Sequence, residues 1–260
     1  MKVTIFSSNQ ARHLNLARVF SQIADDVFFV SEVNTVFPGQ VEDFYQKTEI
    51  MQSYFTRVIA SQKNIFGEIC FLPDNVKTLA IKSGDLNRLD NSQLKDALSS
   101  DVFIVFGASY IKGWLVDFLV ERRAINIHMG LSPYYRGTSC NFWALYDNKP
   151  EYVGATIHLL SKGLDSGDML CHCVPRLATG DTPFDFTMRS VLVAQKCLVE
   201  AVKSEKIFSL ETVKQDISQE IRYTKNQEFT DKIAEEFLLR EVRLHDQEFV
   251  YPDLLNPQFG

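Results

Sequence analysis

The sequence predicts an α/β protein with a mostly parallel, twisted sheet, helices on both faces and a short C-terminal appendage. β-type runs alternate with helical patterns in the first half of the chain. Two β-type runs follow each other after residue 150, and the chain becomes charged and mixed from about residue 208. A chain of 260 residues allows either one large domain or a domain of about 200 residues with an appendage. Of these we favour the second, with a main domain over residues 1–206 and an extension over 207–260 that packs on it.

The chain begins with a β-α-β pattern. Residues 3–6 (VTIF) form a short β-type run, and residues 27–30 (VFFV) form the next one. Between them, residues 11–24 carry apolar side chains at helical spacing. Strands that alternate with helices in this way lie parallel in one sheet, because the helix returns the chain to the same edge.

The same alternation continues to the middle of the chain. Residues 42–62 have apolar residues along one side and are expected to form a helix. Two further β-type runs lie at 102–106 (VFIVF) and 124–128 (AINIH), with a helical pattern at 114–123 between them. The first half therefore predicts a doubly wound α/β unit.

After residue 150 the order of elements changes. The β-type runs at 154–160 and 169–174 are separated by a glycine-containing loop and no helix, so they are expected to pair as neighbours. Thr182 is a suitable N-cap for a helix over 183–204, and a second helix is expected at 230–240.

Charge and hydropathy exclude two classes of partner. The formal net charge is −6, which argues against nucleic acid because such binding depends on Lys and Arg that neutralise phosphates. No apolar run approaches the ~20 residues of a membrane span, so no membrane partner is expected. The first ten residues, MKVTIFSSNQ, turn polar too early for a signal peptide. A cytoplasmic location follows as the expectation.

The cysteines predict neither a disulfide framework nor a metal site. They are odd in number and lie in apolar or strand-like contexts, so we expect them to be reduced; they are Cys70, Cys140, Cys171, Cys173 and Cys197. Alternation along a strand puts Cys171 and Cys173 on one face and His172 on the other, so four convergent zinc ligands are not expected. His158 is expected to be a buried structural histidine.

An amide and an imidazole lie two residues apart where a predicted strand ends. Asn126 and His128 share one face of that strand, and a glycine-containing loop follows at once. Ligands bind outside the carboxyl ends of strands in open α/β sheets. The two groups can stabilise an oxyanion and shuttle a proton. Asp165 or Asp168 could supply the carboxylate that sets the charge of the imidazole, although an ordinary core strand and an ordinary turn explain the same residues.

The combination of two longer segments is more specific. NIHMGLSPYYRG, followed by GATIHLLSKGLDSGDML, resembles the 10-formyltetrahydrofolate-dependent formyltransferases. This family includes glycinamide ribonucleotide transformylase, methionyl-tRNA formyltransferase and sugar N-formyltransferases. The similarity runs from about Val105 to Leu170. It implies a Rossmann-like formyltransferase fold, Asn126, His128 and Asp165 as catalytic residues, and direct, metal-free formyl transfer from 10-formyltetrahydrofolate to an amine.

The resemblance also implies where the folate co-substrate binds. Residues 106–113 (FGASYIKG) stand where relatives hold the pterin through backbone groups. The folate-binding residues expected are Phe106, Gly107, Ala108, Ser109, Tyr110, Ile111, Leu131, Gly163, Leu164 and Asp168. The loop after His128 departs from the family: residues 129–133 read MGLSP, where relatives have Pro-Ser-Leu-Leu-Pro. No contact is therefore inferred for the missing serine.

Candidate contacts to the amine substrate lie in two places. Asn9, Arg12 and His13 follow the first strand, where a helix N-terminus favours an anion, and they are expected near a phosphate. Helix capping is the alternative for this segment. Arg136 could bind a carboxylate and Tyr134 could stack on the substrate, whereas a solvated arginine and a buried ring are the alternatives.

A nucleotide-linked amino sugar is the acceptor that the sequence favours. The acidic tail argues against tRNA, and the segment SSNQARH replaces the glycine-rich phosphate loop of the glycinamide ribonucleotide branch. An amino acid or glycinamide ribonucleotide remain alternatives, as do a non-catalytic folate-binding protein and hydrolysis of the formyl donor. Hydrolases of this family normally carry an additional N-terminal domain, and the first strand starts at Lys2 here. A homodimer is compatible with the sequence.

Overall fold

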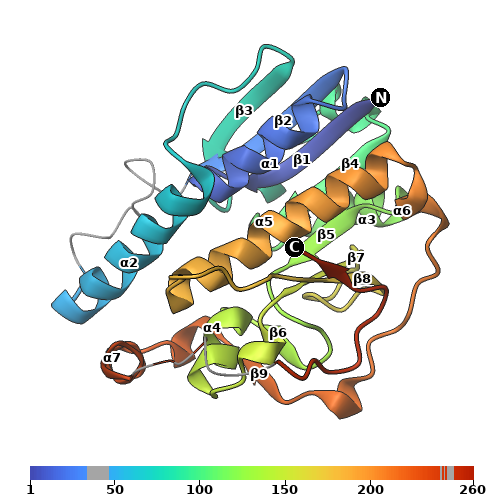
Figure 1. Cartoon of the computed structure of the whole chain (residues 1–260). Helices are drawn as coiled ribbons and strands as arrows, with labels where there is room; N and C mark the ends of the chain where they lie inside the picture. Colours follow the sequence, from blue (N-terminus) through green and yellow to red (C-terminus); the bar gives the residue numbers. More distant parts are fainter. Residues whose placement is uncertain (34–46, 241, 243, 245–248) are drawn as a thin grey trace.

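An eight-stranded, mostly parallel sheet forms the centre of the molecule (Figure 1). The computed structural model describes residues 1–33, 47–240, 242, 244 and 249–260. The strand order is β10-β8-β7-β5-β4-β1-β2-β3, and only β7 runs antiparallel to its neighbours. The strands are β1 Lys2–Ser8, β2 Asp26–Val33, β3 Val76–Lys82, β4 Val102–Phe106, β5 Ile125–His128, β7 Ala155–Leu159, β8 Met169–Val174 and β10 Gln258–Phe259.

Helices cover both faces of the sheet, as predicted. α1 (Ala11–Ser21), α2 (Glu49–Phe66) and α5 (Pro183–Lys203) pack together over one face, and α3 (Gly113–Glu121) lies on the other (Figure 1). Shorter helices are α4 Cys140–Tyr146, α6 Lys206–Ser209 and α7 Asp231–Leu239, with 3₁₀ turns at Leu86–Arg88, Ala97–Ser99, Pro150–Tyr152, Ile217–Gln219 and Asn226–Glu228. Each predicted strand and helix is confirmed within a few residues, except that residues 42–46 of the predicted helix 42–62 lie outside the described residues.

The main hydrophobic core lies between the sheet and α1 and α5. Ile5 and Phe29 from the sheet pack with Phe20 and Leu198 from the helices, all fully buried. Burying each such side chain contributes about 1.5–3 kcal/mol. The core fixes the positions of the strands, and therefore of the side chains at the strand ends.

The predicted N-cap of α5 is confirmed. The Thr182 hydroxyl accepts a hydrogen bond from the Asp185 backbone N–H at 3.1 Å, and the Asp185 carboxylate accepts from the Thr182 N–H at 3.1 Å. This reciprocal capping box satisfies two donors at the helix start. It begins α5 at Pro183, so that the apolar stripe of the helix faces the sheet.

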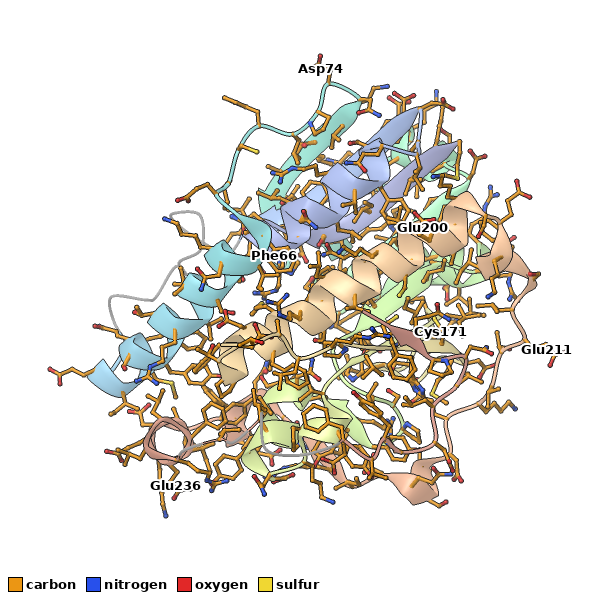
Figure 2. The ribbon with its side chains drawn as sticks, viewed as in Figure 1. Phe66, Asp74, Cys171, Glu200, Glu211 and Glu236 are labelled. Atoms are coloured by element: carbon orange, nitrogen blue, oxygen red, sulfur yellow. The ribbon has the colours of Figure 1, made fainter. Side chains whose placement is uncertain are left out.

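The C-terminal segment runs along one side of the molecule and adds strands to it (Figure 1). β9 (Arg222–Thr224) pairs with β6 (Tyr135–Gly137), and β10 pairs with β8 at the edge of the main sheet. Val213 forms a two-bond antiparallel bridge with Met169. Exposed carboxylates such as Asp74 and Glu211 extend from the periphery (Figure 2). The sequence did not predict β3, β6, β9 or β10.

Candidate active site

The carboxyl ends of β1, β2, β4 and β5 lie at the same edge of the sheet, because these strands are parallel and adjacent. They end at Ser8, Val33, Phe106 and His128. Polar side chains at this edge can reach one another although they are distant in sequence. This is the edge at which open α/β sheets bind ligands.

Asn126, His128 and Asp165 are joined by a hydrogen bond and an ion pair at this edge. The Asn126 Nδ2 donates to Asp165 Oδ1 at 3.0 Å, and His128 Nδ1 lies 3.3 Å from Asp165 Oδ2. Asn126 and His128 are 8% and 6% exposed, whereas the Asp165 side chain is 17% exposed. One carboxylate therefore contacts both β5 side chains. The sequence predicted that Asp165 or Asp168 could supply it.

His158 also belongs to this network, and its contacts indicate which ring nitrogen carries the proton. Its Nδ1 lies 2.8 Å from the Leu159 carbonyl, which can only accept, so Nδ1 carries the proton. Its Nε2 lies 2.9 Å from Asn126 Nδ2 and, in the neutral ring, accepts from it. Both N–H groups of Asn126 are thus donated within the protein. The expected donation from Asn126 to an oxyanion therefore requires that one of these two hydrogen bonds be exchanged.

The electrostatics favour an imidazolium at His128 and a carboxylate at Asp165. Burial alone would lower the pKa of His128, but the nearby Cys140 sulfur and the Asp165 carboxylate outweigh it and raise that pKa well above 6.5. Burial would raise the pKa of Asp165, whereas His128 and His158 lower it strongly. The second ring nitrogen, His128 Nε2, faces the Tyr135 carbonyl at 3.4 Å and Cys140 Sγ at 3.5 Å.

A tight loop presents Asp165 to the strand. Asp165 has a φ of 44°, a left-handed conformation that costs free energy in a residue with a Cβ. Two residues later, a Cβ on Gly167 would lie 1.7 Å from the Leu159 carbonyl oxygen, so no larger residue fits there. The loop needs external support to keep this conformation.

Gln215 of the C-terminal segment supplies that support. Its Nε2 donates to the carbonyls of Asp165 at 2.8 Å and Gly167 at 2.9 Å. The Val213–Met169 bridge anchors the same segment two residues earlier. Gln215 could not be predicted from the sequence, because nothing local to residue 215 indicates contact with a loop 50 residues away.

Replacing Gln215 by alanine should slow turnover by about tenfold, because two hydrogen bonds that hold the Asp165 loop are lost at about 1 kcal/mol each. We expect kcat to fall more than KM changes, with a small drop in melting temperature. Gln219→Ala, which removes only an exposed contact to Asp216, is the control. Equal activity of both variants would show that the loop keeps its conformation without Gln215.

A small cavity of about 90 Å³ opens beside the trio. Its walls include Asn126 and Asp165, and six of the residues expected to bind folate line it: Ala108, Ser109, Tyr110, Ile111, Gly163 and Leu164. The remaining four do not. Phe106 packs on His13, Gly107 faces the same ring, and the fully buried Leu131 packs on Gly154 in another cluster. Asp168 contributes its backbone carbonyl to Leu159 and does not line the cavity.

A buried carboxylate holds the 107–112 loop of this cavity. Glu32, at the end of β2 and 2% exposed, accepts from the Ser109 N–H at 2.5 Å and the Ser109 hydroxyl at 2.8 Å. It also accepts from the Gly84 N–H at 2.8 Å. Glu32 could not be predicted from the sequence, because a single glutamate at a strand end does not reveal which loop it will contact.

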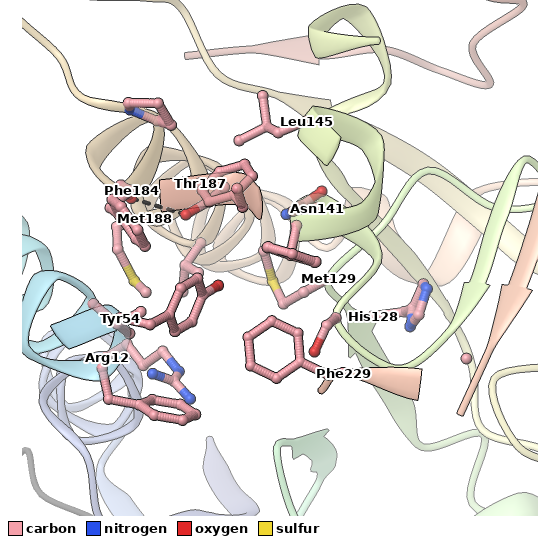
Figure 3. Close-up of a pocket in the computed structure, with 18 residues that line it drawn as sticks. Arg12, Tyr54, His128, Met129, Asn141, Leu145, Phe184, Thr187, Met188 and Phe229 are labelled. Carbon is pink, nitrogen blue, oxygen red and sulfur yellow. Dashed lines mark hydrogen bonds between the residues drawn. The ribbon is translucent and has the colours of Figure 1, made fainter. Parts of the chain in front are cut away.

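A second, larger cavity of about 320 Å³ lies on the other side of the sheet edge, among α1, α2, α4 and α5 (Figure 3). His128 and Met129 line one end, and Arg12 lines another part. Most of the wall is aromatic: Tyr54, Phe55, Phe142, Phe184, Phe229 and Phe237. The trio therefore stands between two cavities, one reached by Asn126 and Asp165 and the other by His128.

Of the three residues in the first helix region that were predicted to contact the substrate, one lines the aromatic cavity and two do not. Arg12 lines the aromatic cavity. His13 is 3% exposed and packs on the Phe106 ring at 5.0 Å, and burial lowers its pKa well below 6.5. Asn9 accepts a hydrogen bond from the Ser8 hydroxyl at 3.4 Å. Neither His13 nor Asn9 lines this cavity.

Tyr134 and Arg136 contact the C-terminal segment and line neither cavity, so their role as substrate contacts stays a prediction. The Tyr134 hydroxyl donates to the Asp253 carbonyl at 2.9 Å, and Arg136 Nη1 donates to Glu220 at 2.8 Å. Tyr134 precedes β6 and Arg136 lies in it, and β6 pairs with β9 of the C-terminal segment. Proximity to His128 in sequence did not reveal this pairing.

All five cysteines are free. Cys171 and Cys173 face one side of β8, whereas His172 on the other side contacts the Ser132 carbonyl and the Leu255 N–H. Within the described ranges, no group of three or more His, Cys, Asp or Glu side chains could hold a metal ion. No helix in the described part of the chain combines the length and apolarity of a membrane span.

Comparison with known proteins identifies the relatives of this fold and site. A family model described as formyl transferase matches residues 1–202. The chain is 31% identical over 123 residues to a methionyl-tRNA formyltransferase of Anaeromyxobacter dehalogenans (strain 2CP-1 / ATCC BAA-258), covering 47% of this chain and 39% of that protein. It is 29% identical over 126 residues to formyltetrahydrofolate deformylase 2, mitochondrial, of Arabidopsis thaliana, covering 46% and 36%. The matches thus span well under half of these relatives.

Two solved structures share the fold. A 4-N formyltransferase from Francisella tularensis superimposes with a TM-score of 0.53 at 16% identity, over 88% of this chain and 77% of that one. A sugar N-formyltransferase from Shewanella sp. FDAARGOS_354 gives a TM-score of 0.51 at 19% identity, over 88% and 78%. At these identities the likeness shows a common Rossmann-like architecture.

Proposed function

The chain belongs to the formyl transferase family, and we propose that it transfers the formyl group of 10-formyltetrahydrofolate to the primary amine of a small acceptor. One observation carries the proposal: Asn126, His128 and Asp165, joined by a hydrogen bond and an ion pair, stand between two cavities. The small cavity would take the formyl-bearing end of the folate, and the aromatic cavity would take the acceptor.

The reaction is a direct acyl transfer. The unprotonated amine nitrogen attacks the formyl carbon, a new C–N bond forms, and the carbonyl oxygen becomes an oxyanion. The bond from the formyl carbon to folate N10 then breaks, and the proton lost by the attacking nitrogen goes to N10. The products are a formamide and tetrahydrofolate, so no oxidant, reductant or metal is required.

The oxyanion would be stabilised by the positive charge of His128 and by a hydrogen bond from Asn126. The imidazolium of His128 provides positive charge, and its raised pKa keeps it protonated at neutral pH. Asn126 can exchange the hydrogen bond that it gives to the neutral His158 ring for one to the oxyanion, because a charged acceptor binds an N–H more strongly. An oxyanion donor of this kind contributes about 3 kcal/mol to the transition state.

Asp165 has two tasks in this proposal. Its carboxylate keeps His128 charged and orients its ring through Nδ1. It can also pass the proton from the attacking nitrogen to N10 through water, because its side chain is the most exposed of the three. Asn126 remains bound to the other carboxylate oxygen and fixes the position of the group.

Three classes of small primary amine are candidates for the acceptor. An amino sugar, nucleotide-linked, is the first class to test, since one neighbour in fold is a sugar N-formyltransferase. An amino acid and glycinamide ribonucleotide are the alternatives. Hydrolysis of the donor by water is a second candidate function, which the similarity to a formyltetrahydrofolate deformylase favours.

Loss of 10-formyltetrahydrofolate, followed by absorbance with and without a panel of amines, tests the proposal. We expect donor loss that depends on an amine and yields a formamide detectable by mass spectrometry. Loss at the same rate without any amine would establish the hydrolase. Binding of the donor without turnover, for every amine in the panel, would identify a folate-binding protein and overturn the proposal.

A further inference from the structure

The aromatic cavity is built around one tyrosine. The Tyr54 ring lies 4.9–6.3 Å, between centroids, from the rings of Phe55, Phe142, Phe184, Phe229 and Phe237. These rings come from α2, α4, α5, α7 and the segment before α7. A wall of this kind favours an apolar ring or chain, because a sugar would lose water from its hydroxyls without gaining partners.

Few polar groups of the wall remain available to a ligand. Asn141 donates to the Ser190 hydroxyl at 2.9 Å and accepts from the Gly154 N–H at 3.0 Å. The Thr187 hydroxyl donates to the Phe184 carbonyl at 2.8 Å. These two side chains therefore serve the fold, although they border the cavity.

Unlike Asn141 and Thr187, Tyr54 and Arg12 have polar side-chain groups that are available to a ligand. Tyr54 is 8% exposed, and within the described residues its hydroxyl has no hydrogen-bond partner. The guanidinium of Arg12 likewise has no carboxylate or other hydrogen-bond partner among the residues that the structure describes; only its backbone carbonyl is bound, by Gln195. Both side chains point toward the cavity in Figure 3. A half-buried cation in an apolar wall is costly unless an anion joins it.

The charge of the cavity wall indicates which kind of anion can bind there. Arg12 is the one permanently charged side chain among the described residues that line this cavity, since His128 is paired with Asp165. A single guanidinium matches one carboxylate, in a two-point hydrogen bond. A diphosphate carries more negative charge than one cation neutralises. Burial lowers the pKa of Arg12 to about 10, as expected for a cation without a resident partner.

We propose that the acceptor is an aromatic amino acid or a close analogue. Its ring lies among the phenylalanines and its carboxylate binds Arg12. The acceptor also receives a hydrogen bond from Tyr54, and its amine points toward His128. The volume of about 320 Å³ suits one ring and its substituents. The inference rests on the proposed formyl transfer and chooses among its acceptors.

The test measures binding and turnover separately, with L-phenylalanine, L-phenylalaninamide, L-alanine and a nucleotide-linked amino sugar. Binding is followed by calorimetry and transfer by formamide production. We expect phenylalanine to bind and to be formylated at least tenfold better, in kcat/KM, than alanine or the amide. Arg12→Gln should weaken phenylalanine about 10- to 100-fold and leave phenylalaninamide unchanged, and Tyr54→Phe should weaken it severalfold.

The control is Arg18→Gln on the same helix, whose guanidinium contacts Cys70 and does not line the cavity. Formylation of the amino sugar without binding of phenylalanine would overturn this inference and leave the proposed transfer standing. Arg12-dependent binding of phenylalanine without any transfer would support the site and contradict the reaction. An equal loss of both phenylalanine and its amide in Arg12→Gln would also overturn the carboxylate assignment.

Discussion

The Asp165→Asn variant is expected to turn over about 10²- to 10⁴-fold more slowly than the unchanged chain, because the acid-base partner of the reaction is lost. Asparagine keeps the shape of the side chain but cannot hold a negative charge beside His128. Without this charge the pKa of His128 falls, and a ring that is less often protonated stabilises an oxyanion less. Steady-state formyl transfer at saturating donor and acceptor measures the effect on kcat.

The pH dependence gives a sharper readout than the rate alone. The pKa of His128 is raised above 6.5, so the stabilisation from its charge is complete below 6.5 and is lost as the pH rises through the raised value. The pKa of Asp165 is lowered below 3.8, so its contribution is complete above 3.8 and is lost as the pH falls through the lowered value. Both contributions are complete between 3.8 and 6.5.

In Asp165→Asn, burial acts on His128 without the opposing carboxylate. Its pKa should therefore fall, and the alkaline limb of the kcat profile should move to lower pH by about 1 unit or more. Asp74→Asn controls for the change in net charge, because this exposed carboxylate precedes β3 and lies at the edge of the sheet opposite the site. A variant that keeps more than a tenth of the activity and the same alkaline limb would mean that Asp165 does not set the charge of His128.

Most of the fold could be predicted because its elements carry local signals. The runs at 102–106 and 169–174 became β4 and β8 with the same ends, and Thr182 began α5. β3 carried no such signal: its side chains are mostly exposed, and pairing with β2 is what makes residues 76–82 a strand. β10 is two residues long and exists through contact with β8.

The candidate site also has parts that could be predicted from the sequence and parts that could not. The resemblance predicted Asn126, His128 and Asp165, which the structure brings together, and the loop after β4, which lines the small cavity. It could not predict the aromatic cavity, since Tyr54, Phe184 and Phe229 come from separate segments and each fits an ordinary buried stripe. Nor could it predict that β6 turns toward β9, because that pairing depends on residues about 90 positions later.

Gly167→Ala is expected to reduce activity by about 10²-fold, although residue 167 would touch no substrate. The added Cβ would lie 1.7 Å from the Leu159 carbonyl oxygen, which is backbone and cannot rotate away. That oxygen accepts from His158 Nδ1, and His158 in turn accepts from Asn126. Displacing it would disturb the ring, the amide and the Asp165 loop together.

Gly180→Ala, in the turn before α5, is the control, because residue 180 lines neither cavity. A Cβ there would meet no atom within 4 Å, so the replacement adds the strain of a φ of 83° without a steric clash. Circular dichroism and melting temperature establish that both variants fold, and kcat then separates them. If both kept the activity of the unchanged chain, the hydrogen-bonded chain from Leu159 through His158 to Asn126 would not be what holds the trio in place. A selective loss in Gly167→Ala would mean that catalysis depends on a backbone contact made by none of the three reacting side chains.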